Sequence, residues 1–298
     1  MRVNPQYLNN VVGALDQTTA VQQQLTEEIS SGNAVQQLSD NPAAVGQNVL
    51  LSTAISAADQ YQQTASSAQG MLQVTDSTLG SVVSQLTQAL SLATEGNNGT
   101  LNASNEQAIA TQLTGIRDEV LSLANTSYLG QYLFSGSVNA APFSINTTSS
   151  PATVTYHGDA AVNSVTTPDG QAIALNVPGD QIFTAGGASA LGALNQLIAD
   201  YSSNNISAAQ NDINQLSTAL SNVSQKRVAL DNSLTRLTAT GGFAQTQSTQ
   251  LQFTQTTLMQ ADLAEVATQL KNSETQQSAL MQVFSALGTN SLFNVIRG

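Results

Sequence analysis

The feature of this chain that most constrains its fold is a run of residues spaced alternately three and four positions apart. The run consists of Ile206, Ala209, Ile213, Leu216, Leu220, Val223, Arg227, Leu230, Leu234 and Leu237. This spacing places the side chains on one face of a helix, as in a coiled coil. Because only Arg227 departs from the apolar rule, the segment predicts a long helix that buries a single seam.

The same spacing recurs in four more segments. Two central seams comprise Leu72, Thr75, Leu79, Val82, Leu86, Ala89 and Ala93, and then Ile109, Leu113, Ile116, Val120 and Leu123. The N-terminal seam comprises Val11, Ala14, Thr18, Val21 and Leu25. The last series runs from Leu263 to Leu287, with a polar middle at Ser273 and Gln277. A stripe at helical spacing is usually a core, so we predict that residues 72–93 and 206–237 form the core of the folded chain.

Turn-forming residues separate these helical segments. Ser39-Asp40-Asn41-Pro42 is expected to end one helix and cap the next, because Asp and Asn accept N-terminal amides and Pro suits a first turn. The stretch from Glu95 to Thr100 reads as a turn between the two central seams, so those helices should run antiparallel. Ser135-Gly136 is expected to end the third helix.

Between about residues 138 and 190 the period changes from helical to alternating. Ala152, Val154 and Tyr156 alternate with polar residues, and so do Ile173, Leu175 and Val177. Asp169-Gly170 is typical of a hairpin turn. The region therefore predicts a small β-rich insertion between long helices.

The predicted fold class is mainly α, with long antiparallel helical hairpins, terminal coiled-coil helices and a small β-rich domain inserted in the middle. We expect terminal helices at 1–35 and 263–298, a helical rod domain from 36–137 and 190–262, and an outer β-rich domain at 138–189. A hairpin of long helices brings both chain ends to one pole, where the N-terminal seam and the last series could pair.

The terminal segments differ from the central seams in composition. They are rich in Ser, Thr, Asn and Gln, several of which are poor helix formers, and isolated helices are marginal in water. Only 9% of all residues are charged, which favours surfaces that pack against other protein chains. We therefore predict that the terminal helices fold against each other or against neighbouring subunits.

Charge and composition exclude several classes of function. The net charge is −12, and the basic residues are scattered at Arg2, Arg117, Lys226, Arg227, Arg236, Lys271 and Arg297. Nucleic acid and anionic membranes are therefore poor partners. The chain has no Cys, and no run reaches the length of a signal peptide or a membrane span, so we expect no membrane insertion and, if it is secreted, a route without a cleaved signal.

No pattern of residues supports catalysis. His157 is the only His, and one His without Cys cannot make an ordinary zinc site. The Gly-containing stretch from Gly179 to Gly192 lacks the spacing of a phosphate loop, and the acidic residues are well separated. We therefore expect no catalytic, cofactor-binding or metal-binding residues, no cofactor and no enzyme activity.

Several motifs resemble those of the bacterial flagellin family, which includes flagellins and hook-associated proteins. The motifs are Ile29-Ser30-Ser31-Gly32, Leu38-Ser39-Asp40-Asn41-Pro42-Ala43-Ala44, Gln60-Tyr61-Gln62-Gln63, Leu121-Ser122-Leu123-Ala124-Asn125 and Gly130-Gln131-Tyr132-Leu133-Phe134-Ser135-Gly136. Pro142-Phe143, Tyr156-His157-Gly158-Asp159, Pro178-Gly179-Asp180-Gln181-Ile182-Phe183 and Ser291-Leu292-Phe293 look most like the family's subunits at the junction of hook and filament.

The resemblance implies a structural subunit of the extracellular flagellum that adapts hook to filament. Such subunits leave the cell by flagellar type III export and associate with their own kind and with other hook-associated protein and flagellin subunits. It implies that a cytosolic export chaperone binds the C-terminal segment. Assembly and chaperone binding would then use a C-terminal seam, which we define as Leu263, Val266, Leu270, Leu280, Phe284, Leu287, Leu292 and Phe293.

Two other interpretations stay open from the sequence. The chain could be a flagellin, which would build long filaments by itself. It could also be a helical adhesin or binding module whose β insertion recognises a ligand, which would predict a folded monomer with ordered termini.

Overall fold

The computed structural model describes residues 5–97, 102–186 and 189–296, without the side chains of 5, 7, 8 and 287–296. The chain forms two compact units. Unit 1 combines residues 1–57 with 247–298, and unit 2 comprises residues 58–246. The elements in chain order are α1 (Pro5–Ser31), α2 (Pro42–Gly96), α3 (Ala103–Ala124), β1 (Ser127–Tyr128), β2 (Gln131–Tyr132), β3 (Phe143–Asn146), β4 (Thr153–Tyr156), β5 (Ser164–Thr166), β6 (Ala172–Ala174), α4 (Asp180–Phe183), α5 (Ala190–Ser202), α6 (Ile206–Met259) and α7 (Leu263–Ile296).

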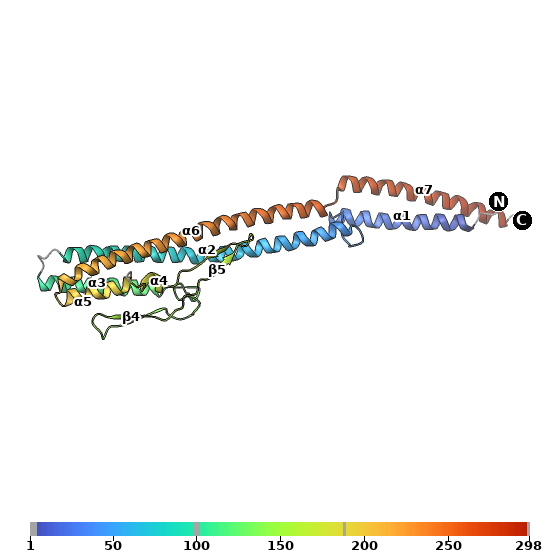
Figure 1. Ribbon diagram of the computed structural model, residues 1–298. Coiled ribbons are helices and arrows are strands. Elements are labelled where there is room, and N and C mark those ends of the chain that lie inside the picture. The colour runs from blue at the N-terminus through green and yellow to red at the C-terminus, as the bar shows by residue number, and fades with distance from the viewer. Residues whose placement is uncertain (1–4, 98–101, 187–188, 297–298) are drawn as a thin grey trace. The chain divides into compact units, whose positions relative to one another are not determined.

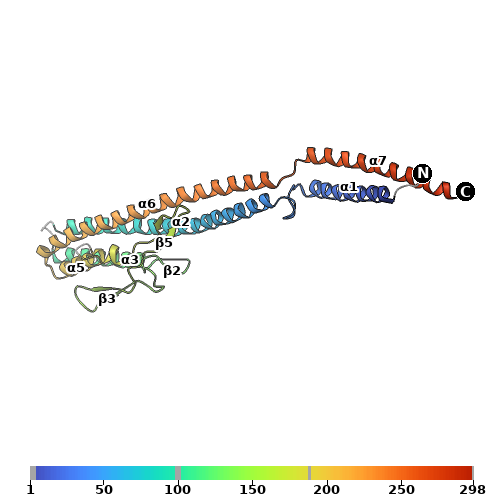
Figure 2. The same cartoon turned by 45° about the vertical axis from the view of Figure 1, so that its right-hand side comes forward.

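The predicted mainly α fold with a small strand region in the middle is confirmed. In unit 2, α3 runs back beside α2, and α5 packs against α3 (Figures 1 and 2). The core contains the two central seams and the run from Ile206 to Leu237, with Leu79, Leu86, Leu113, Leu216 and Val223 fully buried. The apolar period therefore identified the residues that this unit removes from water.

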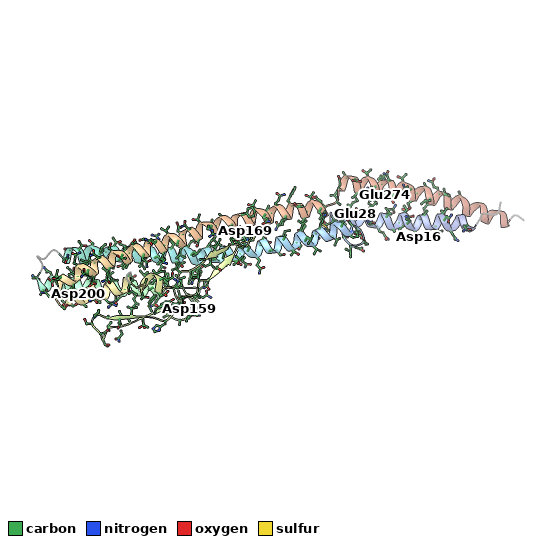
Figure 3. The ribbon with its side chains drawn as sticks, in the orientation of Figure 1. Asp16, Glu28, Asp159, Asp169, Asp200 and Glu274 are labelled. Carbon is green, nitrogen blue, oxygen red and sulfur yellow. The ribbon has the colours of Figure 1, made fainter. Side chains whose placement is uncertain are left out.

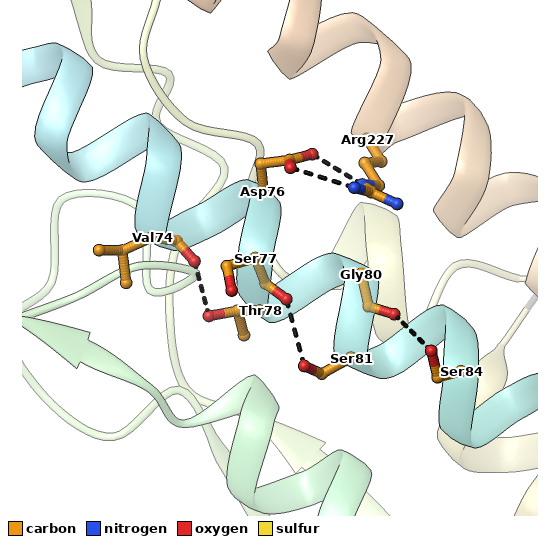
Figure 4. Close-up of polar contacts among 8 residues, drawn as sticks. All are labelled: Val74, Asp76, Ser77, Thr78, Gly80, Ser81, Ser84 and Arg227. Atoms are coloured by element: carbon orange, nitrogen blue, oxygen red, sulfur yellow. Dashed lines mark hydrogen bonds and ion pairs between the residues drawn. The ribbon is translucent and has the colours of Figure 1, made fainter.

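Arg227 stays partly exposed at its seam position and pairs with an acidic residue on the facing helix. Its Nε and Nη2 donate to the two carboxylate oxygens of Asp76 at 2.7 and 3.1 Å (Figure 4). Gly80 lies against the guanidinium, since a Cβ built there would be 3.4 Å from Arg227 Cζ. The hydrogen bond to Asp76 raises the pKa of Arg227. A paired charge at one seam position favours a single register between α2 and α6.

The expected turn chemistry before α2 is confirmed. Asn41 Oδ1 accepts a hydrogen bond from Ala44 N at 3.0 Å, and Pro42 opens the helix. The side chain of Asp40 binds the preceding loop, because its Oδ2 accepts hydrogen bonds from Gln36 N and Gln37 N. These backbone donors hold the pKa of Asp40 below its ordinary value.

The third helix ends earlier than Ser135-Gly136, where the sequence placed its end. α3 stops at Ala124, and Asn125 then binds the backbone of Phe143 in both directions, donating Nδ2–H to its oxygen at 3.0 Å and accepting its N–H at 2.9 Å. The chain between them is the β1–β2 hairpin, whose turn at Leu129 and Gly130 has positive φ at both positions. After the helix ends, the side-chain amide of Asn125 thus pairs with the Phe143 backbone in the way that a neighbouring strand would.

The described strands form three separate two-stranded antiparallel sheets. β3 pairs with β4 from Phe143 opposite Tyr156, and β5 pairs with β6 from Ser164 opposite Ala174. The predicted turn at Asp169-Gly170 joins β5 to β6, with Gly170 N donating to Thr167 O at 2.9 Å. Ile173 is fully buried, so strand β6 fixes this hairpin to the core of unit 2.

We expect a short peptide tag inserted between Asp169 and Gly170 to leave the melting temperature of unit 2 almost unchanged. Gly170 has positive φ, and a Cβ built there meets no atom within 4 Å, so the tip faces open space. Thermal melting followed by circular dichroism tests this. The same tag between Phe134 and Ser135, which are both buried, is the matched control and should melt much earlier. Equal losses for the two insertions would contradict the prediction.

Candidate functional site

The terminal helices of unit 1 begin and end at clear local signals. α1 ends at Ser31, and the next residue, Gly32, has φ +72°, a conformation that glycine adopts without strain. Gly32 donates its N–H to Glu28 O at 2.8 Å. Asp262 caps α7, because its Oδ1 accepts from Ala264 N at 3.0 Å and Glu265 N at 3.2 Å. Local residues, Gly32 and Asp262, therefore determine where α1 ends and where α7 begins.

The two linkers that adjoin these helices are hydrogen-bonded to each other. Ala34 N donates to Met259 O at 2.8 Å, and Ala261 N donates to Gly32 O at 2.9 Å. Asn33 and Gln260 face each other as an antiparallel bridge. This bridge aligns the end of α1 with the start of α7, and the two helices then lie side by side (Figure 1).

A groove of about 750 Å³ lies between α1 and α7. Four N-terminal seam residues line it from α1: Ala14, Thr18, Val21 and Leu25. Val11, the fifth, is buried. From α7 the lining includes Leu280, Val283, Ala279 and Ser273. The structure therefore brings the N-terminal seam together along one face that looks onto α7.

The C-terminal seam lies on α7, and its described residues differ in how far they are buried. Val266 is buried in a small cluster with Leu25 and Ala261, and Leu270 packs against it. Leu280 lines the groove, whereas Leu263 is 50% exposed and Phe284 is 44% exposed. Leu287, Leu292 and Phe293 lie among the residues whose side chains are outside the described part of the chain.

The middle of the α1–α7 contact is polar, as the sequence indicated. Ser273 is buried, and Gln277 Nε2 donates to Thr19 Oγ1 at 3.3 Å. Two buried polar atoms, Gln22 Nε2 and Ser273 Oγ, have no hydrogen-bond partner within the described residues. An unpaired buried polar group costs about 1–3 kcal/mol. The packing of α1 against α7 is therefore less stable than that of an all-apolar helix pair of the same length.

Large apolar side chains remain exposed on both terminal helices. They are Val12, Val21 and Ile29 on α1, and Leu263, Met281, Val283 and Phe284 on α7. Their neighbours are mostly uncharged polar residues, since only Asp16, Glu27, Glu28, Glu265, Lys271 and Glu274 carry charge between residues 5–31 and 263–296. A surface with this composition suits burial against further helices.

A second cluster, in unit 2, explains three of the sequence motifs. Phe134 O accepts from Tyr156 Oη and from Gly179 N, both at 2.9 Å. A Cβ at Gly179 would lie 2.8 Å from that oxygen, so only glycine fits. Asp159, labelled in Figure 3, accepts hydrogen bonds from Ser137 N and Ala161 N. Its bonds to Ser137 hold the pKa of Asp159 below its ordinary value. The motifs around Phe134, Tyr156 and Gly179 therefore meet in one structural junction.

The residues considered for chemistry form no recognisable active site. His157 follows β4 at the surface, where its Nε2 lies 2.7 Å from Ser144 Oγ across the hairpin. Within the described residues, no three His, Asp or Glu side chains are grouped so as to hold a metal ion. Over the same ranges, no helix has an apolar stretch long enough to cross a membrane.

Sequence reasoning missed the bridge between the two linkers. The residues that form it, Gly32 to Ala34 and Met259 to Ala261, show no strand pattern, and their pairing depends on the placement of two distant helices. The one available signal in the sequence was Gly32, because a glycine that adopts positive φ marks the end of α1 and so the start of the linker.

The comparisons with known proteins agree with the motifs. Residues 6–139 match the family described as bacterial flagellin N-terminal helical region. The resemblance to the bacterial flagellin family is thereby confirmed over that stretch.

Individual relatives point in the same direction. The chain is 32% identical over 189 residues to flagellar hook-associated protein 3 of Salmonella typhimurium, covering 62% of this chain and 57% of that protein. It is 28% identical to flagellin A of Vibrio anguillarum, covering 50% of this chain and 38% of that protein. The chain thus spans little more than half of the length of the first relative.

A solved structure supports the fold. The flagellar junction protein of Legionella pneumophila superposes with a TM-score of 0.58 and 15% identity, over 73% of this chain and all of that one. At this identity the likeness establishes a shared fold.

Proposed function

We propose that this chain is a non-enzymatic structural subunit of the bacterial flagellum, an adapter at the junction of hook and filament. The observation that carries the proposal is the incomplete pairing of α1 and α7. It leaves a groove of about 750 Å³, buried polar atoms without partners in the described residues and several exposed apolar side chains. Further helices from neighbouring subunits would fill the groove and cover these side chains. The similarity to hook-associated protein 3 of Salmonella typhimurium supports the position at the junction.

The proposal includes the partners and the domain boundaries expected from the sequence. Terminal helices within 1–35 and 263–298 form the core of the assembled tube, the rod domain takes 36–137 and 190–262, and the β-rich domain at 138–189 faces outward. The chain leaves the cell by type III export, self-associates, and contacts other hook-associated protein and flagellin subunits. Before export, a cytosolic chaperone covers the C-terminal seam, because an exposed apolar stripe in the cytosol favours aggregation.

Flagellin is the second candidate, and the similarity to flagellin A of Vibrio anguillarum favours it. The two candidates differ in how many copies a flagellum holds and where they lie. A junction subunit occupies a short zone, whereas a flagellin extends along the whole filament.

We expect a tagged chain to label only a short zone between hook and filament. The tag goes between Asp169 and Gly170, at the exposed hairpin tip. Immunogold electron microscopy of intact flagella from the native host measures where the tag lies along the flagellum. Labelling along the whole filament would establish the flagellin alternative, and flagella without label would remove both candidates. An untagged strain is the control for stray gold.

A further inference from the structure

Three carboxyl side chains are buried close to the turn that joins α5 to α6. Glu106 on α3 is 5% exposed, Asp200 on α5 is 4% exposed and Asp212 on α6 is 5% exposed. Figure 3 shows Asp200 at this end of the α5 helix. A buried carboxylate normally has a cationic partner, because removing an ionised group from water is costly.

These carboxyls have polar but uncharged partners among the described residues. Asp212 Oδ1 accepts from Gln215 Nε2 at 3.1 Å, and Glu106 faces the side-chain amide of Asn204. Asp200 Oδ2 is buried and has no hydrogen-bond donor in that part of the chain. No ion pair within the described residues involves any of the three.

We infer that Asp200 and Asp212 share one proton, and that this proton holds the α5–α6 turn together. A proton on Asp212 turns its carboxyl into a donor and gives Asp200 Oδ2 the partner that it lacks. Without the proton, two buried negative charges would lie side by side in a low-dielectric site, which like-charge repulsion disfavours. The turn is thus a pH-sensitive element that is independent of the proposed flagellar function.

The surroundings of the pair reinforce this inference. Burial, and then the neighbouring Asp200 carboxyl, raise the pKa of Asp212 to about 7. On the same helix as Asp200, burial followed by the charges of Glu106 and Asp200 raises the pKa of Tyr201 to about 12, so the phenol stays neutral. Its hydroxyl donates to Ala93 O on α2 at 2.5 Å. The groups named around the pair, Glu106 on α3, Tyr201 on α5 and the Ala93 carbonyl on α2, therefore include no cation.

The direction of the pH effect follows from the raised pKa. Stability from the protonated pair is fully present below the ordinary carboxyl pKa of about 4, and it is lost as the pH rises toward the folded-state value of about 7. Asp40 and Asp159 have lowered pKa values, so the stability that they contribute is lost only as the pH falls below about 4. The two effects occupy different pH ranges and can be measured separately.

The unfolding equilibrium constant of the full chain should rise with pH between about 4.5 and 7 and then level off. One released proton corresponds to a slope of up to about tenfold per pH unit. Urea unfolding at a series of pH values measures the slope. Asp212→Asn should flatten it, because the amide donates to Asp200 at every pH. Glu119→Gln, at an exposed carboxyl on α3, is the matched control and should keep the wild-type slope.

A direct measurement decides the matter even if a variant folds poorly. The wild-type chain labelled with ¹³C at aspartate carboxyl carbons should show one buried carboxyl that titrates near neutral pH, and Asp200→Asn or Asp212→Asn should remove that signal. If all aspartate carboxyls are ionised by pH 5.5, or if Asp212→Asn keeps the full wild-type slope, the shared proton does not exist.

Discussion

Phe183→Ala is expected to lower the free energy of unfolding of unit 2 by about 3–5 kcal/mol, the range for removing a buried aromatic ring. Phe183 is fully buried and sits edge-on to two rings, with centroids 5.2 Å from Phe134 and 5.3 Å from Phe143. Such edge-to-face pairs add about 0.5–1.5 kcal/mol each to the burial of the ring. The substitution would therefore remove both the apolar contacts and the ring pairs that hold α4 against the strands.

The melting temperature of unit 2 should fall by roughly 6–20 °C, given about 2–4 °C per kcal/mol for a unit of this size. Calorimetry measures this shift. Phe243→Ala is the matched control, because Phe243 lies on α6 in the same unit but is 65% exposed. A shift for Phe183→Ala no larger than that for Phe243→Ala would show that the aromatic cluster does not determine the stability of unit 2.

The helical part of unit 2 was predictable because its signal is local and repeated. Leu72 to Ala93 and Ile206 to Leu237 keep the three–four spacing over many turns. The structure buries every position of the first series and most of the second. Arg227 was visible as an exception, but its partner Asp76 lies 151 residues away in sequence. Periodicity predicts which face of a helix is buried, but it does not predict which residue of another helix packs against that face.

The strand region was predictable only in outline. The alternation around Val154 and Ile173 was correct, and so was the turn at Asp169-Gly170. The early end of α3 was missed because it depends on Asn125 pairing with the backbone of Phe143, 18 residues later. Likewise, Gly179 is explained only once Phe134 O is known to lie where a Cβ would be. These are contacts between segments, which no window along the sequence contains.

The candidate site was predicted unevenly. The N-terminal seam lines one groove, as a helical stripe should, and the polar middle at Ser273 and Gln277 faces α1. On the C-terminal seam, α1 covers only part of the stripe, because Val266 is buried while Leu263 and Phe284 are half exposed. A long helix with a weak apolar pattern can pair through any of several faces, and the linker bridge at Asn33 and Gln260 selects one.

Leu280→Asp should weaken self-assembly by about tenfold or more, since burying a leucine side chain is worth about 1.5–3 kcal/mol. Leu280 lines the groove opposite Ala14 and Thr18, where a carboxylate would be desolvated. Hydrogen exchange along α1 and α7 of the monomer should become faster, because the same side chain supports their pairing. Affinity for the export chaperone should also fall if the chaperone covers this face.

The melting transition of unit 2 separates this outcome from general unfolding. Its core lies within residues 58–246, which do not include Leu280, so calorimetry should show an unchanged transition for the variant. Gln282→Asp is the matched control, because it adds the same charge two residues away at an exposed position of α7 and should assemble normally. If Leu280→Asp assembles as well as Gln282→Asp, the groove is not an assembly surface, and the subunits must associate through the exposed apolar residues elsewhere on the terminal helices.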